Sequence, residues 1–365
     1  MHNPLSLETL WRAGVDAVGG ENSVHKALTD TPITPPDQII AVGKAACAMA
    51  KTAVRLFPNT PCLVVTKYDH GQDCPKSAHL IEAAHPVPDA QSISAGQALC
   101  DAVKRCKPGS HLLCLVSGGA SALAEVLPEG WSLDRLASET QRMLASGADI
   151  HAMNARRKEI SQIKGGKLLA LFQGTKVTTL AISDVEGDVL GVIGSGIGDA
   201  FPDATFAFDA RIVASNAIAR HAVAKAAGEP LICNEETLYD DIGALAFRLG
   251  KTLKAGPAGL YLFGGEPTVI LPETPGMGGR NMALGLSLAR EMQGTDIEIL
   301  VAGTDGTDGP TDAAGAIVTG KTWTDRGQDA LDRADAYPFL RDANALFKSG
   351  PTGTNVMDLL IARKR

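Results

Sequence analysis

Short apolar runs alternate with helical patterns along most of this chain. The runs QIIAVG, from Gln38, and HLLCLVSGG, ending at Gly119, have the length of buried strands. KVTTLAISD ends at Asp184, and ARIVAS leads directly into the helical pattern NAIARHAVAKAA. Strands that alternate with helices are typical of parallel sheets covered by helices on both faces. The pattern therefore predicts an α/β fold.

The alternation continues beyond a segment that contains glycine and proline. KTLKAGPAGL, from Lys251, separates a long helical stretch from a new strand, GLYLFGG. A chain of 365 residues also exceeds the size at which a single hydrophobic core stops growing. We therefore predict two domains: residues 1–254, with a Rossmann-like parallel sheet between helices, and residues 255–365, a smaller α/β domain.

Composition and charge exclude several classes of protein. The net charge of −7 argues against nucleic acid as a partner. No apolar run reaches the roughly 18 residues that a membrane span requires, and the N-terminal stretch lacks the pattern of a signal peptide. We therefore expect a cytoplasmic protein with small-molecule partners, and the sequence leaves a homodimer open. The seven cysteines include no C-x-x-C pair, which predicts free thiols rather than disulfides or zinc ligands.

Glycine-marked loops follow several predicted strands, at the end of the strand where α/β sheets bind ligands. In AVGKAA, Lys44 opens a helix, either as a solvated surface residue or beside an anion that the free N–H groups also bind. In VSGGASA, residues 117–121 form either an anion-binding nest or a tight turn. In GMGGRN, Arg280 begins a helix, and its planar guanidinium suits phosphate or carboxylate.

Two further loops carry carboxylates. In ISDVEGDVLG, Asp184 and Asp188 suit Mg²⁺, which takes one or two protein carboxylates, although an Asx turn is the alternative. The stretch GTDGTDGPTDAAGA begins at Gly303, the last residue of the apolar run IEILVAG. Within it, Asp305 is the candidate catalytic carboxylate. We expect Asp308 and Asp312 to cap turns or the following segment rather than to act directly.

Two motifs that bind nucleotides fail on closer inspection. GAIVTGKT, from Gly315 to Thr322, satisfies the phosphate-loop pattern, but its apolar, β-branched middle predicts a strand. We therefore do not expect Lys321 to bind phosphate. No G-x-G-x-x-G follows a predicted strand, which argues against a nicotinamide-dependent enzyme.

Together these loops resemble the glycerate 2-kinase family, in which an N-terminal glycerate-kinase domain precedes a C-terminal MOFRL domain. Members have often been labelled hydroxypyruvate reductases. This chain departs from the family pattern at Ala120, where a third glycine is usual, and at Met282 and Ala283, where Gln-Glu is usual. The matching stretches, in the family's order from Val42 to Leu359, are VGKAA, HPVPD, VSGGASAL, RRKEISQIKGGKLLA, SDVEGD, GGEPTV, GGRN, GTDGTDGPTDAAGA and GPTGTNVMDL.

The resemblance implies ATP- and Mg²⁺-dependent phosphorylation of D-glycerate to 2-phosphoglycerate, in a cleft between the two domains. Lys44, Arg280 and Asp305 match positions of the family's active-site basic and acidic groups. On this reading we expect Lys44 and Arg280 beside the transferring phosphoryl group, and Asp305 to orient the attacking hydroxyl or accept its proton. Asp184 and Asp188 are then the candidate Mg²⁺ ligands. The candidates for binding substrate or nucleotide are Ser117, Gly118, Gly119, Ser121, Asn281, Thr354 and Asn355.

Two other functions remain as alternatives: an NADH- or NADPH-dependent hydroxypyruvate reductase, and a sugar-acid binding protein without catalysis. The missing dinucleotide fingerprint argues against the reductase. The lysine, arginine and aspartate residues in separate strand-end loops argue against a purely binding protein. Whether residues 117–121 hold the glycerate carboxylate or a nucleotide phosphate is left open at this point.

Overall fold

Two six-stranded sheets organise the chain, and each belongs to its own compact unit. The computed structural model describes residues 4–145 and 150–365. The N-terminal unit comprises Gly19–Ser215 and Gly353–Asn355. The C-terminal unit comprises the residues up to Val18 together with Asn216–Thr352 and Val356–Arg365.

A parallel sheet forms the centre of the N-terminal unit, as the strand–helix alternation predicts. Its strands are β1 (Gln38–Val42), β2 (Cys62–Lys67), β3 (His79–Ala83), β4 (His111–Val116), β5 (Lys176–Ile182) and β6 (Ala207–Ala214). They pair in the order β3-β2-β1-β4-β5-β6. All residues of β1 and β4 are buried, as expected for strands covered on both faces. The strand order reverses between β1 and β4, and such a switch point is where doubly wound sheets bind ligands.

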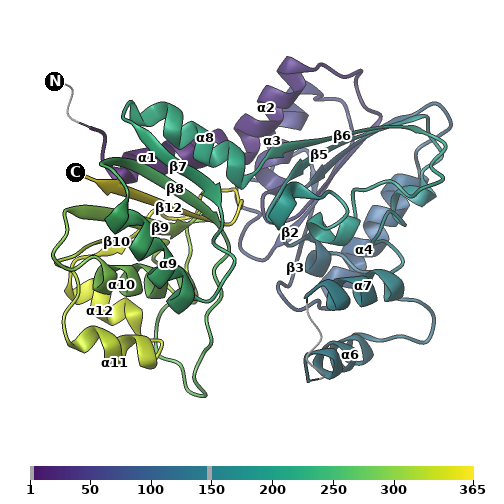
Figure 1. Ribbon diagram of the computed structural model, residues 1–365. Coiled ribbons are helices and arrows are strands. Elements are labelled where there is room, and N and C mark those ends of the chain that lie inside the picture. The colour runs from purple at the N-terminus through teal and green to yellow at the C-terminus, as the bar shows by residue number, and fades with distance from the viewer. Residues whose placement is uncertain (1–3, 146–149) are drawn as a thin grey trace. The chain divides into compact units, whose positions relative to one another are not determined.

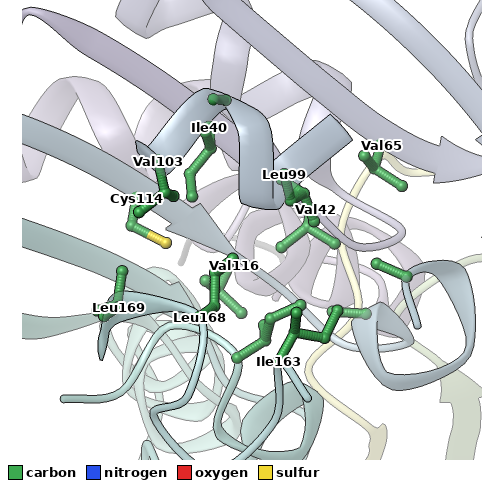
Figure 2. Close-up of a cluster of buried hydrophobic side chains, with 14 of the residues drawn as sticks. Ile40, Val42, Val65, Leu99, Val103, Cys114, Val116, Ile163, Leu168 and Leu169 are labelled. Carbon is green, nitrogen blue, oxygen red and sulfur yellow. The ribbon is translucent and has the colours of Figure 1, made fainter. Parts of the chain in front are cut away.

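Helices of the N-terminal unit bury the apolar faces of this sheet. Leu99 and Val103 share one buried cluster with Ile40 and Val42 of β1, and Ile163 joins it from the QIKGG stretch (Figure 2). Each such side chain contributes about 1.5–3 kcal/mol by leaving water. The helices are α2 (Gly20–Asp30), α3 (Ala46–Leu56), α4 (Ala90–Lys104), α5 (Ala120–Leu123), α6 (Leu133–Ala145) and α7 (Ile150–Ile160).

The sheet of the C-terminal unit is mixed. Its strands are β7 (Leu231–Glu236), β8 (Gly259–Gly265), β9 (Ile297–Gly303), β10 (Gly315–Thr319), β11 (Leu346–Phe347) and β12 (Asp358–Lys364). They pair in the order β11-β10-β9-β12-β8-β7, and β12 runs antiparallel to both of its neighbours, β8 and β9. The first residue of β12 therefore lies at the edge where β8 and β9 end. The alternating pattern does not predict this inserted strand.

Six helices cover the two faces of the second sheet. They are α1 (Leu7–Ala17), α8 (Asn216–Ala227), α9 (Ile242–Ala255), α10 (Arg280–Glu291), α11 (Arg326–Asp332) and α12 (Ala336–Asp342). α1 and α8 lie together on one face, and α9 and α10 lie together on the other (Figure 1). Gly14 permits the close approach of α1, because a Cβ atom there would lie 2.7 Å from Val223 of α8.

The compact units do not divide at the boundary that we predicted between residues 254 and 255. β7 pairs in parallel with β8, and α9 packs on α10, so residues 216–255 belong to the C-terminal unit. The chain changes units at Ser215 instead. Gly256 and Pro257, which suggested the boundary, lie in the turn between α9 and β8.

All seven cysteines are free thiols, and five of them are buried. None of the helices in the described ranges combines the length and the apolar character that crossing a bilayer requires.

Candidate active site

The turns that follow β1 and β4 lie against each other at the switch point of the N-terminal sheet. The backbone N–H of Lys44 donates to the carbonyl of Gly118 at 2.9 Å. The N–H of Ala45 donates to Oγ of Ser117 at 3.0 Å. Gly43 has a φ of +130°, and a Cβ atom there would collide with Ser117. The structure therefore brings three predicted site residues together, with the buried Ser117 hydroxyl holding the turn that carries Lys44.

Gly118 and Gly119 connect this turn to further polar groups. A Cβ atom on Gly118 would overlap the carboxylate of Asp184, which follows β5. Gly119 has a φ of +83°, and a Cβ atom there would lie 3.1 Å from Cγ of Lys44 and 3.2 Å from Cδ2 of His85. Both glycines thus permit close approach, so that Lys44, His85 and Asp184 lie around one short loop.

Two side chains beside this loop differ in charge: Lys44 is cationic, whereas the imidazole of His85 is neutral. Lys44 is half-buried, and within residues 4–145 and 150–365 no carboxylate forms an ion pair with it. Burial and the charges of Lys44 and Lys67 lower the pKa of His85 to about 4, so its imidazole is neutral near pH 7. We did not assign a role to His85 from the sequence, although HPVPD is among the family stretches.

The predicted metal ligands follow β5. Asp184 is half-buried beside Gly118, and Asp188 has a φ of +54°. Oδ1 of Asp188 is buried without a hydrogen-bond partner among the described residues. The described part of the chain contains no group of three or more His, Cys, Asp or Glu side chains that could hold a metal ion. A metal here would therefore need further ligands from water or a substrate, and the assignment stays a prediction.

A cavity of about 400 Å³ opens beside Gly119 and Ser121. Oγ of Ser121 lies 2.8 Å from Oγ of Ser195. Glu125 and Lys164 form an ion pair in the cavity wall, and both side chains are only 2% exposed. Burial lowers the pKa of Lys164 despite the attraction of Glu125. We did not foresee this pair, although Lys164 lies in the QIKGGKLLA stretch of the family pattern.

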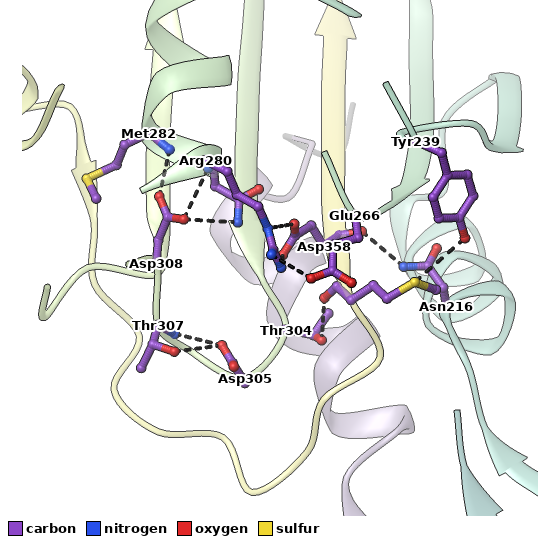
Figure 3. Close-up of polar contacts among 12 residues, drawn as sticks. Asn216, Tyr239, Glu266, Arg280, Met282, Thr304, Asp305, Thr307, Asp308 and Asp358 are labelled. Carbon is purple, nitrogen blue, oxygen red and sulfur yellow. Dashed lines mark hydrogen bonds and ion pairs between the residues drawn. The ribbon is translucent and has the colours of Figure 1, made fainter. Parts of the chain in front are cut away.

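Polar residues of the C-terminal unit converge where β8, β9 and β12 meet. Asp358 of β12 is paired in register with Gly265 of β8 and Gly303 of β9, the last residues of those strands. Glu266 follows β8, and Arg280 begins α10 beside it. Figure 3 shows Glu266, Asp305, Asp308 and Asp358 around the same edge.

Arg280 is held by two carboxylates. Its Nε donates to Asp358 at 2.7 Å and its Nη2 to the same carboxylate at 3.3 Å, while Nη1 donates to Glu266 at 2.6 Å (Figure 3). Burial alone lowers the pKa of Arg280, but Asp358 and Glu266 raise it above its ordinary range. A guanidinium carries five N–H donors, so Arg280 keeps donors beyond these three bonds, and its side chain is 34% exposed.

Asp308 caps α10, a helix that precedes it in the chain, whereas the sequence suggested that it caps a turn or the segment that follows it. Its carboxylate accepts the N–H groups of Asn281 at 3.1 Å and Met282 at 2.7 Å. Burial raises the pKa of Asp308 to about 7, although these N–H bonds and Arg280 lower it. The predicted binding residue Asn281 is only 1% exposed, and its amide also reaches Asp308. Asn281 therefore lies behind the helix terminus rather than on an open surface.

Asp305 stands at the more open end of the same loop. Its Oδ1 accepts from both the N–H and the hydroxyl of Thr307, each at 3.0 Å, which forms an Asx turn. Its backbone carbonyl accepts from Thr352 at 3.3 Å. The side chain is half-buried, so Asp305 keeps a partly solvated carboxylate in a fixed orientation.

Thr354 and Asn355 belong to the N-terminal unit by their contacts. The residues on either side of them are anchored to Thr304: the hydroxyl of Thr352 donates to its carbonyl at 2.6 Å, and Val356 N–H donates to its Oγ1 at 2.8 Å. The intervening Gly353 lies close to Ala48 of α3, the helix that follows Lys44. Thr354 is buried and Asn355 is half-buried.

The phosphate-loop pattern is part of the sheet. GAIVT forms β10, which pairs antiparallel with β9, as its β-branched residues predict. Lys321 is exposed in the turn beyond β10. Its N–H donates to the side-chain hydroxyl of Thr319, and the N–H of Thr322 donates to the carbonyl of Thr319 at 3.0 Å, so the turn satisfies its own N–H groups.

Comparisons with known proteins agree with this architecture. Residues 6–230 match a family described as a domain of unknown function, DUF4147, and residues 259–358 match the MOFRL family. D-glycerate 2-kinase of Thermotoga maritima is 36% identical, with 99% of each chain covered. Glycerate 2-kinase of Pyrococcus horikoshii is 34% identical, with 89% of this chain and 86% of that protein covered.

One further relative and one solved structure are also similar to this chain. An Agrobacterium vitis protein with a provisional hydroxypyruvate reductase name is 35% identical, with 88% of this chain and 97% of that protein covered. A crystal structure of glycerate kinase from Thermotoga maritima has a TM-score of 0.89 at 31% identity, with 98% of both chains covered. The chain therefore belongs to the glycerate 2-kinase family, with an N-terminal DUF4147 region followed by a MOFRL region.

Proposed function

We propose that this chain is a Mg²⁺-dependent kinase that transfers a phosphoryl group from ATP to D-glycerate and forms 2-phosphoglycerate. The observation that carries the proposal is the grouping of Lys44, Gly119 and Asp184 at the switch point of a parallel sheet. Phosphoryl transfer requires positioning and charge neutralisation more than covalent chemistry. The relatives from Thermotoga maritima and Pyrococcus horikoshii carry names for this activity.

Lys44 is the proposed cation for the transferring phosphoryl group. It has no carboxylate partner among the described residues, so its charge is available to an anion. Backbone groups of Gly118 and Gly119 line the same turn, and Ser117 positions it. A preorganised cation at the developing charge needs no reorganisation during the reaction, which is the main source of electrostatic catalysis.

Arg280 and Asp305 are the residues that we propose contact D-glycerate. Arg280 is fixed by Asp358 and Glu266 and offers its remaining N–H donors to a carboxylate or phosphate. Asp305 is fixed by Thr307 and orients the attacking hydroxyl or accepts its proton. Asn281 contacts the carboxylates of Asp308 and Asp358, while Ser121, Thr354 and Asn355 remain proposed binding residues.

The two carboxylates after β5 fit Mg²⁺. Asp188 has a buried oxygen that lacks a hydrogen-bond partner among the described residues, and Asp184 lies against Gly118. Mg²⁺ commonly binds one or two protein carboxylates together with substrate phosphates. When bound, it would neutralise phosphate charge, and Asp184 and Asp188 would hold it.

One assay separates this proposal from the alternatives. The protein is incubated with D-glycerate, ATP and Mg²⁺, and in parallel with hydroxypyruvate and NADH or NADPH. We expect ³¹P NMR to show 2-phosphoglycerate in the first reaction, and no oxidation of the nicotinamide in the second. The strand order of the first sheet suits a dinucleotide as well, so nicotinamide oxidation without phosphoryl transfer would assign the reductase. Dominant 3-phosphoglycerate would refute only the regiochemistry.

A further inference from the structure

The cavity beside Gly119 has walls that are mostly apolar. Its volume of about 400 Å³ falls within the range of small-molecule sites, which is about 300–1,000 Å³. Pro86 and Val87 line one side, from the loop after β3, and Leu136 and Ala137 of α6 line another. Predominantly apolar walls of this kind are typical of sites that bind small molecules.

Polar groups occur at a few points around these walls. Thr140 and Gln141 face the cavity from α6, and Arg157 faces it from α7. The ion pair of Glu125 and Lys164 closes part of the wall. A few polar groups in an apolar wall can form specific hydrogen bonds to the edge of a ring system.

The cavity adjoins the groups that we propose for phosphate binding. Gly119 and His85 both line it. The Lys44 side chain lies close to Gly119, and the Asp184 carboxylate lies close to the adjacent Gly118, since a Cβ atom on either glycine would crowd them. A ligand in the cavity can therefore extend past Gly119 to a lysine and a carboxylate of the same unit.

The chemistry of the cavity distinguishes the two substrates of a glycerate kinase. D-glycerate is a three-carbon acid whose oxygens need hydrogen-bond partners, and burying unpaired polar groups is costly. It would leave most of this volume and its apolar walls unused. A nucleoside has a flat ring with polar edges, a ribose, and a phosphate chain that leaves from one end.

We propose that the cavity beside Gly119 binds the base and ribose of the nucleotide, so that the turn of residues 118–119 receives phosphate rather than the glycerate carboxylate. This inference rests on the proposed kinase function. It assigns nucleotide recognition to the N-terminal unit, with Ala137 and its neighbours on α6 against the base, and leaves the glycerate carboxylate to Arg280.

Ala137→Phe tests the cavity by filling it. Ala137 is exposed on α6, so the protein should tolerate the larger side chain. Calorimetric titration should show that the Kd values for ADP and for adenosine rise at least about tenfold. The KM for D-glycerate at saturating ATP should stay within about twofold. Ser138→Phe, at an exposed neighbour outside the cavity, is the matched control and should leave all three values unchanged.

The outcomes separate this inference from the kinase proposal. If wild type binds ADP and Ala137→Phe binds it equally well, the cavity assignment is wrong and the kinase stands. A rise confined to the KM for D-glycerate would show that the turn of residues 118–119 binds the glycerate carboxylate instead. If the wild-type protein neither binds ADP nor transfers a phosphoryl group, the proposed kinase function itself is wrong. Photolabelling of the unaltered protein with 8-azido-ADP should mark peptides from α6, and labelling confined to the C-terminal unit would overturn the inference.

Discussion

Removing the guanidinium of Arg280 should destabilise the C-terminal unit as well as impair catalysis. The Asp358 side chain is 2% exposed, and Arg280 holds it through bonds at 2.7 and 3.3 Å. Burial raises the pKa of Asp358, while Arg280 and Asn281 lower it. In Arg280→Ala, Asp358 loses the charge that compensates its own.

The expected loss follows from the burial of Asp358. Removing one member of a buried ion pair costs about 3–5 kcal/mol, because the other charge stays uncompensated. For a domain of about 150–250 residues, each kcal/mol shifts Tm by about 2–4 °C, so the loss corresponds to about 6–20 °C. The loss should shrink at low pH, because removing Arg280 raises the pKa of Asp358 further and protonation then neutralises the carboxyl.

Differential scanning calorimetry of Arg280→Ala measures this directly. Glu266→Gln is the control, since Glu266 pairs with the same guanidinium but is 48% exposed, and an exposed pair contributes only about 0–1 kcal/mol. The double variant Arg280→Met/Asp358→Leu should recover most of the stability while phosphoryl transfer stays impaired. A Tm for Arg280→Ala as high as that of Glu266→Gln would refute the reasoning.

Three other predictions concern single side chains. Lys44→Ala should lower kcat by about 10³-fold with an unchanged circular dichroism spectrum, and near wild-type turnover would exclude Lys44 from the mechanism. Lys321→Ala should keep steady-state activity within about threefold of wild type, and a thousandfold loss would overturn the proposed site. Because the pKa of Asp308 is raised to about 7, its contribution to stability is present at low pH and lost between about pH 4 and 7. Wild type should therefore lose stability relative to Asp308→Asn across that window in chemical denaturation, and parallel pH profiles would contradict the assignment.

Local patterns predict the elements that carry the site. The run from Ile297 to Gly303 forms β9, and the pattern NAIARHAVAKAA forms α8 over Asn216–Ala227. Arg280 begins α10 as its position after glycine predicts. These predictions hold because the periodicity of apolar residues and the preference of glycine for turns are local properties of the chain.

The ion pair of Arg280 and Asp358 could not be predicted in the same way. The two residues are 78 positions apart, and they meet because β12 inserts antiparallel between β8 and β9. No local signal distinguishes an aspartate at the start of such a strand from one in an exposed loop. The ion pair of Glu125 and Lys164 could not be predicted from the sequence for the same reason, because it depends on tertiary packing.

Some of the costly local features of the chain lie near the strand ends that carry the proposed site. Asp188 and Ser195 have positive φ angles after β5, and Met357 has one immediately before β12. Such conformations cost on the order of 1–3 kcal/mol each outside glycine and persist only where the surrounding structure holds them. The buried carboxylates of Asp308 and Asp358 add desolvation at the second edge. Replacing buried charged groups by well-packed apolar residues is often neutral or stabilising, so the buried carboxylates at this edge agree better with a chemical role than with a contribution to folding.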